Sequence, residues 1–308
     1  MKYRAYGIVF DSDLEFSELV QATDDDYQVS LKLRNLSEDL DLRSENQWFA
    51  GDNERFWFRV RGVGEFLICR GQEITVQVYD DADLALVRLF VIGSAFAALM
   101  HQRGALVLHG AVLTNGDKAV LFTGESGAGK STLAAMLWNR GYKLVTEDVA
   151  VLYQQDGQWL VYPGYPFMRV CPDMLTALGL DVDRLELVKI FTHTEKYLVN
   201  LRDRFVSVPV MLNEIIVLAK ADQEKYGSQD FNGNMDKFSV VANNTYRSYF
   251  LQPQDLLEQH FHQCASLARQ LTVRKIVRPA GETQIYRTCD FVEAAVWNRK
   301  NGNKNNCC

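Results

Sequence analysis

Alternating apolar and polar side chains mark strands in the first 80 residues. Residues 27–34 place four apolar side chains on one face and polar ones on the other, which predicts a half-buried strand. Residues 56–61 and 74–79 alternate in the same way, and Arg70-Gly71-Gln72 supplies a turn between residues 66–69 and 74–79. Residues 36–46 are acidic and polar and predict a loop. We therefore expect residues 1–82 to form a small, mainly β, largely antiparallel domain.

A long apolar run follows at residues 84–100 and predicts a buried helix that begins at Asp81 or Asp83. Arg88 and Gly93 interrupt the run, which makes it marginal for crossing a bilayer, so we expect no membrane span. An apolar strand at 105–113 then leads through the turn Asn115-Gly116 into a strand at 118–123. That antiparallel pairing departs from an all-parallel nucleotide-binding sheet.

The remaining pattern alternates between strands and helices, which is typical of an α/β protein with a mixed sheet. It predicts a helix over 131–140 ended by Gly141, a strand at 142–145, and a hairpin of residues 149–153 and 159–162 around Asp156-Gly157. Further along it predicts a short helix at 172–180, a strand at 214–219, an exposed insertion at 222–236, and a helix over 245–269 broken near Pro253. We expect one domain at 83–300 and a flexible tail at 301–308.

Composition and charge exclude some classes of function but do not identify one. The chain has 308 residues, is 47% hydrophobic and carries a formal net charge of -6, which argues against a general nucleic-acid binder. The amino terminus leads into a strand pattern instead of a secretory apolar segment, so we expect a cytoplasmic protein. The six cysteines lack metal-ligand spacing and fit reduced thiols. The last two, Cys307-Cys308, leave open a lipidated tail, although a frayed end is the simpler interpretation.

One glycine-rich segment carries clear chemistry. It lies between the strand at 118–123 and the helix at 131–140, and it fits the phosphate-loop pattern. Its glycines permit the positive backbone angles that turn successive N–H groups toward phosphate oxygens. The lysine reaches the outer phosphates and the serine hydroxyl can enter a magnesium shell. The predicted nucleotide-binding residues are Gly124, Glu125, Ser126, Gly127, Ala128, Gly129, Lys130, Ser131 and Thr132.

An acidic pair, Glu147-Asp148, directly follows the predicted strand after the loop helix. One carboxylate can bind the magnesium ion while its neighbour accepts a proton from an attacking hydroxyl. The alternative is a solvated acidic turn. The guanine-reading Asn-Lys-x-Asp motif and the Leu-Ser-Gly-Gly motif of transporter ATPases do not follow, which disfavours GTPases and transporters.

These features together resemble the catalytic domain of HPr kinase/phosphorylase. In that family a His-Gly strand, the phosphate loop, a Lys-Arg-Gly-His segment and an Asp-Asp pair occur in that order, and here His109-Gly110, the loop, Arg140-Gly141-Tyr142 and the acidic pair match them. The stand-alone lasso peptide kinases are more similar still, because they share a segment like Tyr162-Pro163-Gly164-Tyr165-Pro166. The resemblance covers roughly the middle third of the chain.

What the resemblance implies is ATP- and Mg²⁺-dependent phosphorylation of a serine hydroxyl, on a fold shared with phosphoenolpyruvate carboxykinase. By position, Glu147 matches the family's proton acceptor. Asp148 matches the second acid of the pair, which lies nearer the metal, and the resemblance implies that Asp148 and Ser131 bind the metal. His109 matches a histidine that orders the acidic site. A glutamate reaches one methylene further than aspartate, which leaves the division of roles open. His109 could equally be a core histidine of its strand.

Two departures from the family pattern affect the expected reaction and partner. The carboxyl-terminal signature associated with phosphorolysis is missing, so we expect a kinase without efficient reverse activity. The amino-terminal unit does not match that of HPr kinases, so we expect an acceptor other than HPr. HPr kinases assemble as oligomers, and the sequence leaves a homo-oligomer open here.

Phosphoryl transfer also needs cations around the developing charge. The candidates for binding the substrate or the transition state are Arg169, Lys196, Arg202 and Arg247, of which Arg169 and Lys196 are preferred; each could instead be a surface charge. Tyr162 and Tyr165 could line a peptide groove or pack in the core.

The leading hypothesis is a kinase that phosphorylates a serine of a peptide or small protein, and the resemblance implies a lasso-type precursor peptide as that acceptor. A nucleotide-sensing regulator and a small-molecule kinase of carboxykinase-like fold remain alternatives. No sequence motif identifies the acceptor or the number of phosphates that are transferred.

Overall fold

The computed structural model describes residues 1–23, 26–36, 40–43, 47–180, 186–189, 195–222, 225–251, 254–280 and 285–298. The predicted break at Pro253, the predicted tail with Cys307-Cys308 and parts of the predicted loop at 36–46 lie outside these residues. The described chain contains both helices and three β-sheets, which confirms the α/β class with a mixed sheet.

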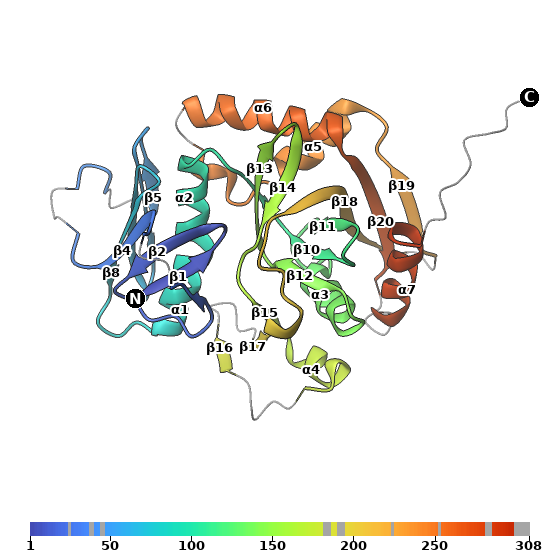
Figure 1. Ribbon diagram of the computed structural model, residues 1–308, viewed down its shortest axis with the longest axis horizontal. Helices are drawn as coiled ribbons and strands as arrows, with labels where there is room; N and C mark the ends of the chain where they lie inside the picture. Colours follow the sequence, from blue (N-terminus) through green and yellow to red (C-terminus); the bar gives the residue numbers. More distant parts are fainter. Residues whose placement is uncertain are drawn as a thin grey trace, which may run out of the picture.

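The amino-terminal sheet has eight strands in the order β3-β1-β2-β4-β8-β7-β6-β5 and lies at the left in Figure 1. The predicted strands and the turn at 70–72 are confirmed. Only the β2–β4 and β4–β8 pairs are parallel, so the sheet is largely antiparallel as predicted. The strands are β1 (Lys2–Ala5), β2 (Ile8–Ser12), β3 (Val20–Gln21), β4 (Val29–Leu33), β5 (Phe49–Gly51), β6 (Arg55–Val60), β7 (Gly64–Cys69) and β8 (Glu73–Val78).

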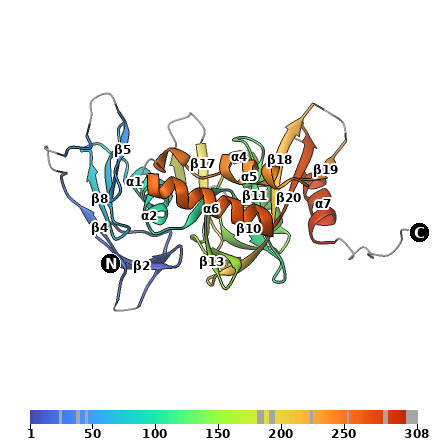
Figure 2. The same cartoon turned by 90° about the horizontal axis from the view of Figure 1, so that it is seen from above.

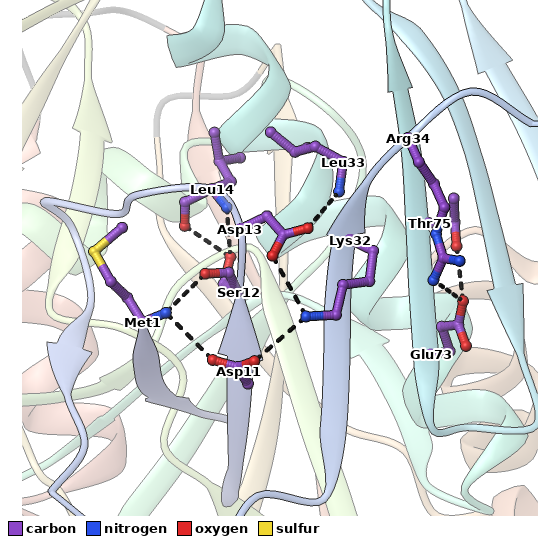
Figure 3. Close-up of polar contacts among 10 residues, drawn as sticks. All are labelled: Met1, Asp11, Ser12, Asp13, Leu14, Lys32, Leu33, Arg34, Glu73 and Thr75. Carbon is purple, nitrogen blue, oxygen red and sulfur yellow. Dashed lines mark hydrogen bonds and ion pairs between the residues drawn. The ribbon is translucent and has the colours of Figure 1, made fainter.

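Polar contacts cross between the neighbouring strands β2, β4 and β8 in the parallel part of this sheet (Figure 3). The Lys32 ammonium on β4 lies 3.4 Å from carboxylate oxygens of both Asp11, near the end of β2, and Asp13, just after it. Arg34, just after β4, pairs with Glu73 on β8 at 3.0 Å. Such exposed pairs contribute about 0–1 kcal/mol each to the free energy of unfolding.

A long helix follows the sheet, as predicted, and begins at Asp83, whose carboxylate accepts a hydrogen bond from the Ala85 amide at 2.9 Å. It comprises α1 (Leu84–Phe90), a π-helical segment η1 (Val91–Ala95) and α2 (Phe96–Gln102). Phe96 packs edge-on against Phe10 of β2 at 4.9 Å between ring centres, which attaches the helix to the sheet. Within the described residues this is the one helix long and apolar enough to cross a membrane, and 61% of its most apolar window is buried inside the protein.

The second sheet has nine strands and carries the predicted phosphate loop. Its order is β12-β10-β11-β18-β14-β13-β9, with β20 beside β18 and β19 beside β20. Strand β18 pairs parallel with β11 and β20, and the other pairs are antiparallel, which makes the sheet mixed. The strands are β9 (Leu106–His109), β10 (Ala111–Thr114), β11 (Ala119–Thr123), β12 (Lys143–Thr146), β13 (Val149–Gln155), β14 (Gln158–Tyr162), β18 (Val210–Ala221), β19 (Gly227–Asp230) and β20 (Thr272–Pro279).

Helices cover both faces of this sheet. One buried cluster joins it to α3 (Lys130–Asn139), α4 (Pro172–Leu178) and α7 (Ile285–Val296), and another joins it to α5 (Asn234–Asn243) and α6 (Gln254–Gln270). Figures 1 and 2 show α6 along the outer face that α5 also covers. A small sheet of β15 (Phe167–Val170), β17 (Glu195–Asn200) and β16 (Glu186–Lys189) lies beside α4, and short 3-10 turns occupy η3 (Arg202–Arg204) and η4 (Ser248–Phe250).

The predicted strand at 105–113 is wrong in one respect, because the structure divides it at Gly110. Strand β9 pairs with β13, whereas β10 forms the predicted hairpin with β11. A β-carbon on Gly110 would lie 2.4 Å from the Phe122 carbonyl oxygen, so only glycine fits where the chain changes partners. A continuous apolar run does not reveal such a change, since both halves are buried.

Two predictions in the carboxyl-terminal part are confirmed only in part. The described residues of the expected insertion at 222–236 are exposed or half-buried, but they include β19. The second half of the expected helix over 245–269 is α6, whereas a turn with η4 replaces its first half. Arg247 adopts a left-handed backbone (φ 48°), and Thr245 bridges to Leu108 of β9, so the chain cannot be helical there. The pattern also did not predict β20 and α7. The expected division at residue 83 stays a prediction, because helix 84–102 shares one buried core with β1 and with β13.

Candidate active site

The phosphate loop connects β11 to α3 in the conformation that its glycines permit. Gly124, Gly127 and Gly129 all have positive φ angles, of 131°, 77° and 103°. A β-carbon on Gly124 would lie 2.3 Å from the Leu218 carbonyl oxygen of the neighbouring strand β18, so the loop can pass there only with glycine. Helix α3 begins at Lys130, so the unpaired backbone amides of its first turn lie at the loop. The result is a cradle of backbone N–H groups of the kind that binds phosphate.

Lys130 reaches back across this loop. Its ammonium donates to the carbonyl oxygens of Gly124 at 2.9 Å and Glu125 at 3.1 Å. Burial lowers the pKa of Lys130, and the nearby Asp148 and Glu147 oppose that shift. The ammonium therefore lies beside the cradle, where an arriving phosphate would compete with the two carbonyl oxygens for it.

Glu147 joins the acidic pair to the loop. Its Oε1 accepts a hydrogen bond from the Ser131 hydroxyl at 2.8 Å, while its Oε2 is buried without a hydrogen-bond partner among the described residues. The residue is only 3% exposed, and this burial raises its pKa despite the charge of Arg169. A hydroxyl and a carboxylate with a spare oxygen are the donors that Mg²⁺ prefers, so the residues fit this ion. No group of three or more His, Cys, Asp or Glu side chains forms an all-protein metal cage in the described chain.

Asp148 faces a different set of partners. It takes a left-handed backbone (φ 67°), and its Oδ2 lies 2.9 Å from the Arg169 guanidinium. The Tyr246 hydroxyl also donates to Oδ2 at 3.4 Å, and Nδ1 of His109 lies 3.4 Å from Oδ1. Burial works to raise the pKa of Asp148, but Arg169 and His109 outweigh it and the pKa is lowered. This carboxylate is therefore ionised at neutral pH.

His109 ends β9 beside the acidic pair, where the resemblance placed it. Its Nδ1 also lies 3.2 Å from the Asp148 carbonyl oxygen. Burial lowers the pKa of His109, against the pull of Asp148, so the imidazole is neutral at pH 7 and can donate from Nδ1. The histidine can thus hold Asp148 in place, and its functional role stays a prediction.

The predicted cations occupy three different surroundings. Arg169 on β15 lies between the two acids, at 2.9 Å from Asp148 and 3.8 Å from Glu147. Lys196 on β17 and Arg247 line cavities at the loop. Arg202 instead covers Phe167 at 5.7 Å and donates to the Ser17 and Leu19 carbonyl oxygens, which attaches η3 to the amino-terminal sheet.

The two tyrosines of the Tyr-Pro-Gly-Tyr-Pro segment also lie in different surroundings. The ring of Tyr162 packs against Gly7 of the amino-terminal sheet, where a β-carbon would lie 2.1 Å from the ring. Tyr165 is buried in the core and contributes to the wall of the larger cavity. Tyr165 therefore lines a cavity at the loop, whereas Tyr162 lines neither of the two cavities there.

Three residues that sequence reasoning missed complete the site. Asn244, at the end of α5, accepts hydrogen bonds from the Thr123 hydroxyl at 2.8 Å and the Gly124 amide at 3.2 Å. Arg278 on β20 donates to the Ala128 carbonyl oxygen at 3.1 Å, and Tyr246 contacts Asp148 as described. None belongs to a recognisable motif, because each comes from a distant segment that only the sheet order brings to the loop.

Two cavities meet at this cluster, with volumes of about 1320 Å³ and 490 Å³. The smaller one contains Lys130, Ser131 and Thr132 together with Met174 of α4. The larger one extends from the first half of the loop to the π-helical segment and α5. His109, Ser126, Asp148, Arg169 and Lys196 line both. A group transferred between two bound molecules would therefore pass these side chains.

Comparison with curated proteins agrees with the sequence motifs. The HPr kinase/phosphorylase of Nitrosomonas europaea is 30% identical over 158 residues, which are 47% of this chain and 47% of that protein. Those of Pediococcus pentosaceus and Lacticaseibacillus casei are 44% and 39% identical over 54 and 61 residues. The chain is similar to HPr kinase/phosphorylases. The match spans about half the length of the first relative and less than a fifth (17% and 19%) of the other two. No protein-family model matches the chain.

Among solved structures, the Hpr(Ser) kinase/phosphatase from Coxiella burnetii aligns with 62% of this chain and 94% of its own, at 18% identity and a TM-score of 0.32. That score is too low to support an argument from the backbone. The similarity to HPr kinase/phosphorylases therefore rests on sequence, and it supports the predicted family. It does not distinguish the lasso peptide kinases within it.

Proposed function

We propose that the protein is an ATP- and Mg²⁺-dependent kinase that phosphorylates a serine hydroxyl of a peptide or small protein. The observation that carries the proposal is the hydrogen bond between Ser131 of the loop and Glu147 of the acidic pair, because it brings phosphate binding and carboxylate chemistry into one site. A lasso-type precursor peptide is the acceptor that we propose, from the resemblance at residues 162–166. We propose an acceptor other than HPr and a predominantly forward reaction.

The geometry favours one division of roles between the two acids. Ser131 and Glu147, which the sequence did not pair, would hold the magnesium ion, since they already share a hydrogen bond and Glu147 has a spare buried oxygen. When bound, the ion neutralises charge on the phosphates. Asp148, which the resemblance placed nearer the metal, would instead accept the proton, because Arg169 keeps it ionised.

The reaction then follows from the positions of these residues. Asp148 takes the proton from the acceptor hydroxyl as that oxygen forms its bond to the γ-phosphorus and the bond to the β-phosphate oxygen breaks. The loop amides and Lys130 stabilise the charge that develops on the phosphates. Lys196 lines both cavities and would contact the phosphoryl group in transit. His109 and Tyr246 hold the Asp148 carboxylate toward the acceptor.

The test is transfer of phosphate to candidate precursor peptides in the presence of ATP and Mg²⁺, followed by mass spectrometry. Asp148→Asn should lower kcat by about 10²- to 10⁴-fold while ATP still binds, because the loop is unchanged. Asp156→Asn is the matched control: this exposed aspartate also has a left-handed backbone (φ 49°) but lies in the hairpin turn of β13 and β14. Full turnover in Asp148→Asn would contradict the assignment of the base.

The same assay separates the alternatives. ATP binding without transfer to any peptide would favour a nucleotide-sensing regulator. ATP consumption that a metabolite stimulates and that peptides leave unchanged would favour a small-molecule kinase.

A further inference from the structure

Arg247 stands out among the cations of the larger cavity by its backbone. It lies in the turn between α5 and α6 and precedes η4, with φ 48° and ψ 57°. A left-handed conformation is disfavoured by about 1–2 kcal/mol for a residue other than glycine. Such strain persists where the surrounding structure holds a side chain in a required position.

The guanidinium of Arg247 is fixed by aromatic rings. It lies over the ring of Tyr246 at 5.5 Å and over that of Phe250 at 6.0 Å, and one Nη donates to the Tyr249 hydroxyl. Stacking on the rings fixes the plane of the guanidinium. A fixed guanidinium plane favours binding of a carboxylate through two parallel hydrogen bonds.

The charge of Arg247 lacks the kind of partner that Arg169 has. Arg169 forms an ion pair with Asp148, whereas no carboxylate lies within ion-pair distance of Arg247 among the described residues, and its charge acts on Asp148 only from further away. Its Nε is moreover buried without a hydrogen-bond partner in the described chain. A mostly buried cation that lines a cavity and has no carboxylate paired with it in the described chain is suited to bind an anion that arrives with a ligand.

One tyrosine links this site to the reaction. The Tyr246 hydroxyl contacts Asp148, and the face of the same ring lies under Arg247. The proposed base and the guanidinium thus contact the same tyrosine side chain, one at its hydroxyl and one over its ring. A gap of this kind is spanned by roughly two or three residues of extended chain, at about 3.3–3.6 Å per residue.

The surroundings of Arg247 fit a polypeptide better than a metabolite. Tyr249, which accepts from Arg247, packs against Trp48 at 5.0 Å, and Trp48 is 49% exposed. The next residue, Phe49, begins β5, the last strand in the order of the amino-terminal sheet (Figure 1). An exposed aromatic side chain and a strand edge thus continue outward from the cavity, and both are features that bind extended peptides.

We propose that Arg247 binds the carboxylate of an acidic residue in the acceptor peptide, two or three residues from the serine that is phosphorylated. The peptide would run from the cavity over Tyr249 and Trp48 toward β5. This inference rests on the proposed kinase function and adds to it the charge of the substrate and its register.

The experiment uses the full chain, ATP, Mg²⁺ and pairs of serine peptides that differ only by Asp or Asn at each position within four residues of the serine. Each peptide is made with a free and with an amidated carboxyl terminus, which separates a side-chain carboxylate from a terminal one. We expect an Asp at the favoured position to lower KM by about 10- to 100-fold, as for loss of a charged hydrogen bond, with kcat little changed.

Arg247→Asn should abolish this discrimination and leave the KM for ATP unchanged, and asparagine tolerates the left-handed backbone. Arg70→Asn is the matched control, since Arg70 has φ 52° but is exposed and paired with Glu54. Should Arg247→Asn lower the melting temperature, Arg247→Lys retains the charge without the planar fork and should weaken discrimination only in part.

The outcomes separate the two proposals. Phosphorylation of Asp and Asn peptides with equal KM would overturn this inference and leave the kinase function intact. Equal loss of discrimination in Arg70→Asn would also overturn it. ATP binding without phosphorylation of any peptide would overturn both.

Discussion

At the scale of single residues, the site depends on two adjacent acids that have opposite pKa shifts. Glu147 and Asp148 are neighbours in sequence, yet burial raises the pKa of the first while Arg169 and His109 lower that of the second. Neighbouring groups whose surroundings separate their pKa values are suited to different tasks. The left-handed backbone of Asp148 turns the two carboxylates toward different partners.

Arg169 should therefore control the pH dependence of the proposed reaction. Arg169→Gln removes the cation that favours the ionised form of Asp148, so the pKa of Asp148 should rise and the base should be protonated at higher pH. The acidic limb of the kcat profile should move to higher pH, while the rate at high pH is less affected. A profile with an unshifted acidic limb would show that Asp148 does not limit the rate. Arg202→Gln, which alters an arginine that contacts Phe167, is the control.

Gly124 provides a test of the loop geometry. Gly124→Ala places a β-carbon against the Leu218 carbonyl oxygen and imposes a left-handed backbone on alanine, so we expect a loss of roughly 2 kcal/mol or more in unfolding free energy and loss of ATP binding. Gly116→Ala is the matched control, because Gly116 has φ 107° and no atom within 4 Å of the added carbon. It should show the backbone strain alone. Chemical denaturation and ATP titration measure both effects, and equal losses would contradict the contact with Leu218.

At the scale of elements, the predictions that succeeded depended on local sequence. The loop, its strand and its helix follow from closely spaced glycines, and the Asn115-Gly116 turn specifies its hairpin without distant contacts. The predictions that failed depended on tertiary contacts. The chain passes from pairing with β13 to pairing with β11 at Gly110, where the Phe122 backbone approaches it closely. The turn at Arg247 replaces a helix because Thr245 bridges to β9. For the same reason Asn244 and Arg278 had no sequence signal.

Asn244 connects one such distant element to the loop. Because its side chain accepts from both Thr123 and the Gly124 amide, Asn244→Ala should loosen the start of the loop and raise the Kd for ATP, by about 10-fold for one lost hydrogen bond of average strength. Thr123→Val removes the hydroxyl that shares this contact. If the two residues act together, a double-mutant cycle should give a coupling of about 0.5–3 kcal/mol. Additive effects would show that α5 does not position the loop.

At the scale of the whole molecule, the amino-terminal sheet and the sheet that carries the phosphate loop share a core through helix 84–102. The Tyr6 amide donates to the Pro163 carbonyl oxygen at 2.8 Å, and its hydroxyl donates to the Ile92 carbonyl oxygen at 3.0 Å. The amino-terminal sheet thus contacts both the segment before Tyr165 and the helix that lines the larger cavity. If the acceptor peptide runs over Trp48, the sheet would take part in substrate binding as well as in packing.

Removal of residues 1–82 tests how far the predicted boundary divides two independent folding units. The truncated chain would expose the face of helix 84–102 that packs on Phe10 and Tyr6, and burial of such side chains contributes about 1.5–3 kcal/mol each. We therefore expect the fragment to lose cooperative thermal unfolding, to bind a hydrophobic dye and to bind ATP weakly or not at all. The full chain should unfold in one transition seen equally by fluorescence and circular dichroism. A fragment that unfolds cooperatively and binds ATP with the affinity of the full chain would instead show that the part with the phosphate loop folds alone. The shared core would then be a docking contact between two domains.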